Sequence, residues 1–146
     1  MKKVITLLLL ASICIANQVY AQTTICSFFD MEDSTSTTVF VTDSGFYIET
    51  KYIVDDESNG VICIGHHTDE VLTVMQDIKY FIEHPELEFM LIRIGEEFPK
   101  LYREPDGMDE EDNVLFFPFI TDGTDAWAEL PIQLVEEIIR TFTAVR

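Results

Sequence analysis

The stretch "VICIGHHTDEVLTVMQDIKYFI", residues 61–82, decides the fold, because its hydrophobic pattern changes period in the middle. Residues 61–64 are a continuous apolar run of strand length, which predicts a short strand buried on both faces. From Val71 onward, apolar residues recur at spacings of three, one, three, three and one, the period of an amphipathic helix. They are Val71, Val74, Met75, Ile78, Phe81 and Ile82. Pro85 disfavours helical geometry in the residue before it, so this helix is expected to end near His84.

The segments on both sides of this unit predict further strands and a second helix. Aromatic and β-branched residues indicate strands near 25–30, 37–42 and 46–54, the last two joined by the turn "DSG". After the first helix, "LEFMLIRI" (87–94), a weaker "FPKLYRE" (98–104) and "NVLFFPFI" (113–120) also resemble strands. Pro118 in the last of these indicates a sheet edge or a bulge.

A second amphipathic helix is expected from Pro131 to the end of the chain, because proline favours the first helical position. Its apolar face comprises Ile132, Val135, Ile138, Ile139, Phe142 and Val145. Two helices and several strands predict an α+β fold, a single small domain with a mainly antiparallel sheet of about five to six strands and both helices on one face.

The amino terminus has the pattern of an export signal. Lys2 and Lys3 precede an apolar run from Val4 to Ala16, and small or tolerated residues end at Ala21, after which we expect cleavage. The apolar run is shorter than the roughly 20 residues that cross a bilayer. We therefore expect residues 1–21 to be a signal peptide and residues 22–146 to be a single exported domain, periplasmic or secreted, with no membrane insertion.

The charge of the chain limits its partners. The 27 acidic residues against 9 Lys and Arg give a net charge of −18. Such a chain repels nucleic-acid phosphates and anionic lipid, and it associates fastest with cationic partners. The sequence thus excludes nucleic-acid binding and favours a cationic protein partner, although the same charge also serves solubility. It does not determine the oligomeric state.

Two cysteines, Cys26 and Cys63, lie outside the expected signal. In an oxidising compartment the simplest expectation is a disulfide bond between them, which on a loop-entropy model stabilises by roughly 4 kcal/mol. The alternative is that both are buried as small apolar side chains, since Cys63 lies inside the apolar run at 61–64.

The octapeptide "CIGHHTDE", residues 63–70, contains several metal-ligand residue types, with His66, His67 and Asp69 as weak candidates. Adjacent histidines usually point apart, and His84 is expected at the far end of the helix. A helix start explains the same residues: Gly65 allows a turn, Thr68 is a good N-cap, and acidic residues favour the first turn. We therefore expect no metal site and no cofactor; an exposed, pH-sensitive histidine pair remains open.

Catalytic motifs are missing from the sequence: there is no "GxSxG", "HExxH" or phosphate-binding glycine loop. The acidic segment "EPDGMDEED" (104–112) is expected to be an exposed turn, and it lacks the spacing of a calcium-binding EF-hand. Its residues Asp109, Glu110, Glu111 and Asp112 are candidates for contact with a cationic partner. Trp127, placed in a loop, and Tyr102 are candidate apolar anchors, Trp127 being about as consistent with a core position.

Two functions follow as hypotheses. A signal followed by a small acidic domain resembles, in size and charge, the periplasmic inhibitor and immunity proteins that block cationic lysozymes or toxins. That resemblance implies a non-enzymatic binding protein for a cationic partner. The alternative is a small hydrolase or ligand-binding domain that uses His66 or His67 with nearby carboxylates, and this requires the histidines to line a concave pocket.

Overall fold

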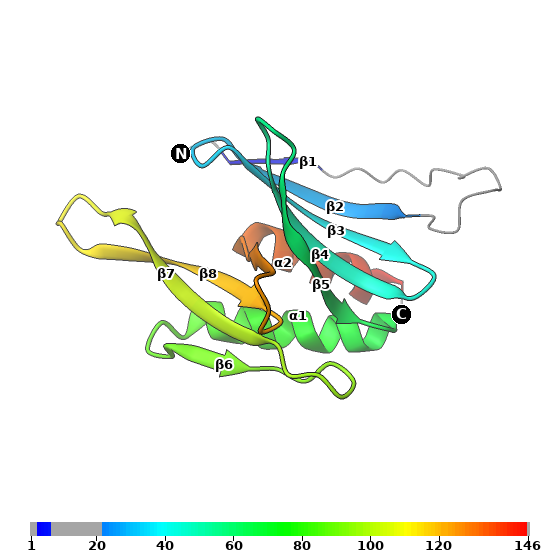
Figure 1. The fold of residues 1–146 in the computed structure, drawn as a ribbon. Helices are drawn as coiled ribbons and strands as arrows, with labels where there is room; N and C mark the ends of the chain where they lie inside the picture. Colours follow the sequence, from blue (N-terminus) through cyan, green and yellow to red (C-terminus); the bar gives the residue numbers. More distant parts are fainter. Residues whose placement is uncertain (1–2, 7–21, 146) are drawn as a thin grey trace.

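The structure, a computed structural model, describes residues 3–6 and 22–145, which form two antiparallel sheets and two helices (Figure 1). The first sheet has the order β1-β2-β3-β4-β5 and the second β6-β7-β8-β9. The strands of the first sheet are β1 (Lys3–Thr6), β2 (Thr23–Asp30), β3 (Thr35–Thr42), β4 (Gly45–Tyr52) and β5 (Ser58–Gly65). Those of the second are β6 (Phe89–Leu91), β7 (Lys100–Met108), β8 (Val114–Thr121) and β9 (Trp127–Glu129). The helices are α1 (Thr68–Glu83) and α2 (Ile132–Ala144).

This architecture confirms the α+β class and the antiparallel pairing, but the prediction of one sheet is wrong. The first sheet ends where β5 runs directly into α1, and the strands that follow α1 pair with one another instead of extending it. The strand expected at 87–94 has only the three residues of β6. Beyond it, the side chains of Ile92 and Ile94 are buried in the core, and the main chain of Ile94 forms hydrogen bonds with that of Glu97. Strand β9 was not expected at all.

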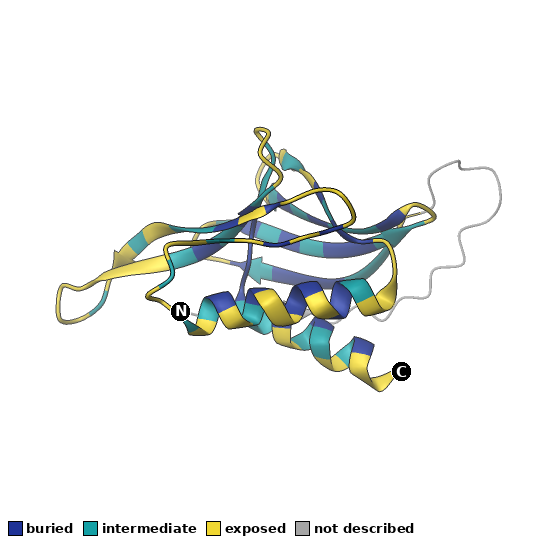
Figure 2. Ribbon diagram, turned by 90° about the horizontal axis from the view of Figure 1, so that it is seen from below, coloured by how far each residue is buried: buried dark blue, intermediate teal, exposed yellow. Residues whose placement is uncertain are grey.

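The two helices pack against each other and place their apolar faces toward the sheets, as Figure 2 shows by the buried stripe along each helix. In α1 the predicted positions Val71, Val74, Met75, Ile78 and Phe81 are buried, which confirms the helical period. Burial of one large aliphatic side chain stabilises by about 1.5–3 kcal/mol, so this stripe fixes α1 on the sheet. In α2, the face built from Leu134, Val135, Ile138 and Phe142 does the same.

The two sheets meet along β9, which contacts β4 and β5, through a layer of buried polar groups. The main-chain N–H of Glu129 donates to Thr50 Oγ1 at 2.9 Å, and Thr35 Oγ1 donates to Glu129 Oε2 at 3.0 Å. The hydroxyls of Thr37 and Thr50 bond each other at 2.8 Å. Because every strand involved is distant in sequence from β9, these bonds specify how the second sheet sits on the first.

The described residues 3–6 fall inside the expected signal peptide. They pair antiparallel with β2, with Lys3 opposite Asp30 and Thr6 opposite Ser27 in the register. The expected cleavage position after Ala21 lies outside the described residues. Within the described ranges, neither helix has the length and hydropathy that a bilayer span requires.

The predicted disulfide bond is not formed; Cys26 and Cys63 are both free. Strands β3 and β4 lie between the two cysteines, so β2 and β5 are roughly 14 Å apart at ordinary strand spacing, whereas bridged Cα atoms lie within about 7 Å. The register Cys26–Val39–Ile48–Ile62 also puts Cys26 on the core face with Ile62, so Cys63 lies on the opposite face. Cys26 is buried, as the alternative interpretation has it, and Cys63 is half-buried.

Candidate functional site

The turn before α1 is a capping structure. The helix begins at Thr68 and its N-cap is His67, which makes no side-chain capping bond, so the prediction of Thr68 as N-cap is wrong. Glu70 instead holds the turn that precedes the helix: its Oε2 accepts from the main-chain N–H of His66 at 2.7 Å and its Oε1 from that of Gly95 at 3.1 Å. These bonds lower the pKa of Glu70. One carboxylate thus fixes the start of α1 and ties it to the loop after β6.

The candidate residues of the octapeptide do not converge. His66 and His67 are exposed, and His66 Nδ1 lies 3.4 Å from the carbonyl of Ser44. His84 lies at the other end of α1, stacked on Tyr80. Within residues 3–6 and 22–145, no three His, Cys, Asp or Glu side chains, Asp69 included, are placed to hold a metal ion. Neither His66 nor His67 lines any of the cavities described below.

The feature that stands apart from the compact body is the β7–β8 hairpin, which projects away from the helices and the first sheet (Figure 1). Strand β6 pairs only with residues 100–102 of β7, and β9 only with residues 119–121 of β8. Residues 103–117, which we call the outer hairpin, therefore form a ribbon of two strands and their turn. A two-stranded ribbon is marginally stable alone in water, so its contacts with the body and with any partner matter to its order.

The outer hairpin carries apolar side chains that the body does not cover. Met108 is 64% exposed and Phe116 56% exposed, and Val114 and Leu115 are also exposed. Along β8, Leu115 and Phe116 project to opposite faces of the ribbon. Large apolar side chains exposed together on a protruding element are typical of an interaction surface.

The tip of the outer hairpin is acidic and internally ordered. Asp109 accepts hydrogen bonds from the main-chain N–H groups of Glu111 at 2.8 Å and Asn113 at 2.9 Å, and the bonds from Asn113 are the main reason that its pKa is lowered. Asp112 has a left-handed backbone, with φ of 62°. Asp109 therefore builds the turn, while Glu110, Glu111 and Asp112 are exposed and face solvent. Part of the predicted turn at 104–112 is strand, because β7 continues to Met108.

Tyr102 and Trp127 belong to one aromatic cluster. Tyr102 stacks on Phe119 with 5.6 Å between ring centroids, and Trp127 meets the same ring edge-on at 5.5 Å. Phe117 packs edge-on against Phe119 from further along β8. The placement of Trp127 in a loop is wrong, since it begins β9. All four rings are half-buried. Tyr102 and Trp127, the two predicted anchors, therefore both pack on Phe119, and neither projects alone into solvent.

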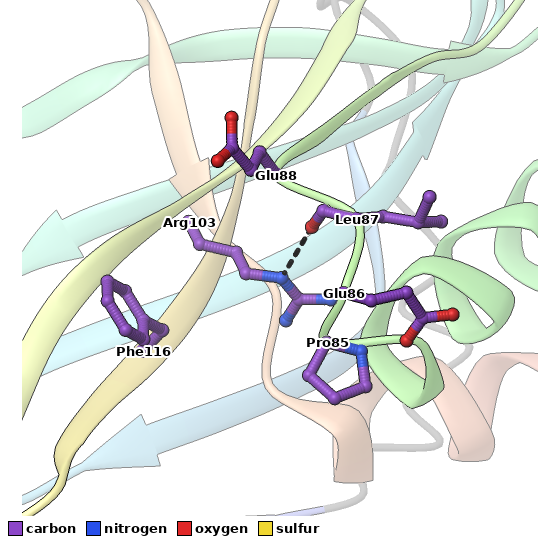
Figure 3. A pocket seen from close by; sticks show the side chains of 6 residues that line it. All are labelled: Pro85, Glu86, Leu87, Glu88, Arg103 and Phe116. Atoms are coloured by element: carbon purple, nitrogen blue, oxygen red, sulfur yellow. Dashed lines mark hydrogen bonds between the residues drawn. The ribbon is translucent and has the colours of Figure 1, made fainter.

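A cavity of about 460 Å³ lies at the base of the outer hairpin, between β7, β8 and the loop after α1 (Figure 3). Its lining consists of Pro85, Glu86, Leu87, Glu88, Arg103 and Phe116. The Arg103 guanidinium closes one wall. Its Nε donates to the carbonyl of Leu87 at 3.1 Å and its Nη2 to those of Phe81 and His84, and its Cζ lies 4.2 Å from the centroid of the Phe81 ring.

Arg103 thus adds side-chain bonds to the carbonyls of Phe81 and His84, which also accept main-chain bonds from His84 and Leu87, and it joins the end of α1 to the hairpin. Burial lowers its pKa, and Glu86 acts in the opposite direction. No motif in the sequence pointed to Arg103 or Phe116, although Leu101 and Arg103 are two positions apart in β7 and therefore share one face of that strand. What the sequence lacked was any sign that the end of α1 lies beside that face.

Two shallower grooves lie on the outer face of the first sheet. One, of about 350 Å³, has hydroxyl side chains of β2 and β3 in its lining, together with Glu49 and Lys51 of β4. The other, of about 460 Å³, contains the stacked rings of Phe40 and Tyr47.

Comparison of the chain with family models, with curated proteins and with solved structures finds no match.

Proposed function

We propose that the chain is a non-enzymatic binding protein of the inhibitor or immunity type, exported to the periplasm or secreted, that binds a cationic protein. The observation that carries the proposal is the outer hairpin, which projects from the body with exposed apolar side chains along both strands and carboxylates at its tip. Binding surfaces of this composition combine an apolar contact with a charged rim.

Charge complementarity favours a cationic partner. The whole chain has a net charge of −18, and Glu110, Glu111 and Asp112 concentrate negative charge at the end of the projecting element. Such an arrangement raises the association rate of a positively charged protein and makes that rate fall as salt is added. Met108 and Phe116 supply the apolar area that a charged rim alone lacks.

The test is capture of a basic protein by the immobilised chain from native periplasmic and culture fluid, at low and moderate salt, with the retained protein identified by mass spectrometry. The decisive variant neutralises the tip by Glu110→Gln, Glu111→Gln and Asp112→Asn, leaving Asp109 to build the turn. Asparagine suits the left-handed backbone at position 112.

A matched control removes the same charge from the β4–β5 turn by Asp55→Asn, Asp56→Asn and Glu57→Gln. This turn is also exposed and also contains a left-handed residue, Asp56 with φ of 56°. We expect the tip variant to lower the association rate constant several-fold and to flatten its salt dependence, and the control variant to change both much less. Equal effects of the two variants, or capture that ignores salt, would contradict the proposal.

A further inference from the structure

The backbone of β8 presents an open edge beyond the end of β9. The carbonyl of Pro118 accepts a hydrogen bond from the N–H of Leu130 at 3.0 Å, so the backbone of residue 118 faces the β9 side. In an antiparallel strand, the N–H and C=O of every second residue point to the same side. The N–H and C=O groups of Phe116 and Val114 therefore face the β9 side too, where no strand of the described residues pairs with them.

The other edge of the ribbon is blocked. The carbonyl of Pro99 accepts from Ile92 at 3.0 Å on the β6 side, so the backbones of Arg103 and Pro105 face outward there. Pro105 has no N–H to donate, and the pairing of β7 with β8 is irregular between Pro105 and Met108. Proline and bulges are the devices that protect sheet edges from adding strands. Residues 114–117, "VLFF", include no proline and no charge, and Pro118, the next residue that faces this side, already bonds Leu130 through its carbonyl.

We propose that the open edge of β8 at Val114 and Phe116 accepts an extended basic segment of the partner as an additional β-strand. The inference rests on the proposed function and specifies how the partner is held. Main-chain bonds to the edge supply affinity, and the exposed side chains of Val114 and Phe116 contact alternate residues of the added strand.

The identity of the occupant follows from charge. A strand beside residues 114–117 lies next to Glu110, Glu111 and Asp112, so a basic segment is attracted. A second copy of this chain would bring an equally acidic tip to the same edge and would be repelled. The occupant is therefore a basic strand of another protein.

The experiment uses the full chain and an acetylated, amidated peptide of eight residues that alternates lysine and valine, with a glutamate–valine peptide as the charge control. Amide hydrogen exchange is measured by NMR with and without peptide. The expected result is that saturating lysine peptide slows exchange at Val114 and Phe116 about tenfold or more, while Leu115 and Phe117, whose amides face β7, change little. The glutamate peptide should have no effect.

A pair of variants separates the backbone from the side chain. Phe116→Ala keeps the outward N–H, and Phe116→Pro removes it without removing a bond to β7, since that N–H faces away from β7. We expect the proline variant to bind the lysine peptide about tenfold more weakly than the alanine variant. Equal affinities of the two variants would overturn strand addition.

The outcomes also separate this inference from the proposed function. Salt-sensitive binding of the lysine peptide that leaves exchange at Val114 and Phe116 unchanged overturns strand addition, while charge-based binding stands. Absence of peptide binding overturns strand addition, and the capture experiment then decides the proposed function by itself. Protection that grows with the concentration of the chain alone shows a second copy at the edge and overturns the basic partner strand.

Discussion

The stability of this protein is predicted to fall as the pH rises from about 4.5 to about 7, because of one buried carboxyl group. Glu129 is 6% exposed and lies between the two sheets, where its carboxyl group accepts a hydrogen bond from Thr35 Oγ1 at 3.0 Å. Burial raises its pKa from the ordinary value of 4.5 to about 7, and the negative charges of Asp30, Asp33 and Asp106 add to the rise. The hydrogen bond from Thr35 acts in the opposite direction but is outweighed.

The sign follows from proton binding. The folded chain holds the Glu129 proton more tightly than the unfolded chain, so protonation stabilises the fold fully below pH 4.5. That contribution is lost as the pH rises through about 7. The interval between a pKa of 4.5 and one of about 7 corresponds to about 3 kcal/mol, an upper value for what this group removes.

The assay is urea denaturation followed by the fluorescence of Trp127, the only tryptophan, at pH 5, 6, 7 and 8. Glu129→Gln keeps the shape and the bond from Thr35 but does not titrate. The variant should lose the part of the pH dependence that belongs to Glu129 and should exceed the native chain in stability at pH 8 by up to about 3 kcal/mol. Glu136→Gln, at an exposed position of α2, is the control and should follow the native profile. Parallel profiles for the native chain and Glu129→Gln would refute the reasoning.

Three further predictions concern the thiols and two side chains, Arg103 and Glu70, that bond main-chain groups at the two ends of α1. Under native conditions Cys26 should not react with a thiol reagent at pH 8, because burial raises its pKa to about 11, and labelling of Cys26 in the folded chain would contradict this. A reductant should not lower the melting temperature, and a melting temperature that depends on reductant would contradict free cysteines. Arg103→Lys should destabilise by about 2 kcal/mol in urea denaturation, because an ammonium group cannot reach the same carbonyls in a fork, and an unchanged midpoint would rule this out. Glu70→Ala should cost about 1 kcal/mol more than Thr68→Ala, since Glu70 bonds two main-chain N–H groups beside the start of α1 and Thr68 is not the N-cap, and the reverse order would contradict this assignment.

Local patterns in the sequence predicted the elements whose causes are local. The apolar period from Val71 to Ile82 and the proline after His84 determine where α1 runs and ends. The turn between β3 and β4 is confirmed for the same reason, since Thr42 and Gly45 face each other across two turn residues.

What depends on distant contacts could not be predicted in this way. Strand β9 has only three residues; it pairs with β8, and Glu129 bonds Thr50 and Thr35, which lie in a different sheet. The prediction of a disulfide bond between Cys26 and Cys63 was wrong because their separation in sequence does not show that two strands, β3 and β4, lie between them in the sheet. The acidic residues 109–112 remain a predicted site, and their place at the tip of a projecting hairpin was not expected, since the projection depends on where β6 and β9 stop pairing with β7 and β8.

The shape of the outer hairpin is not explained by the stability of the fold. Its exposed apolar side chains bury little against the body, and beyond β6 and β9 its strands pair with no further strand of the described residues. The chain nevertheless protects one edge of this ribbon with Pro105 and an irregular pairing, and leaves Val114 and Phe116 open on the other. A ribbon that served only to connect β7 to β8 would need neither the length nor the apolar residues. The asymmetry between its edges is what a surface that receives a strand from one side requires.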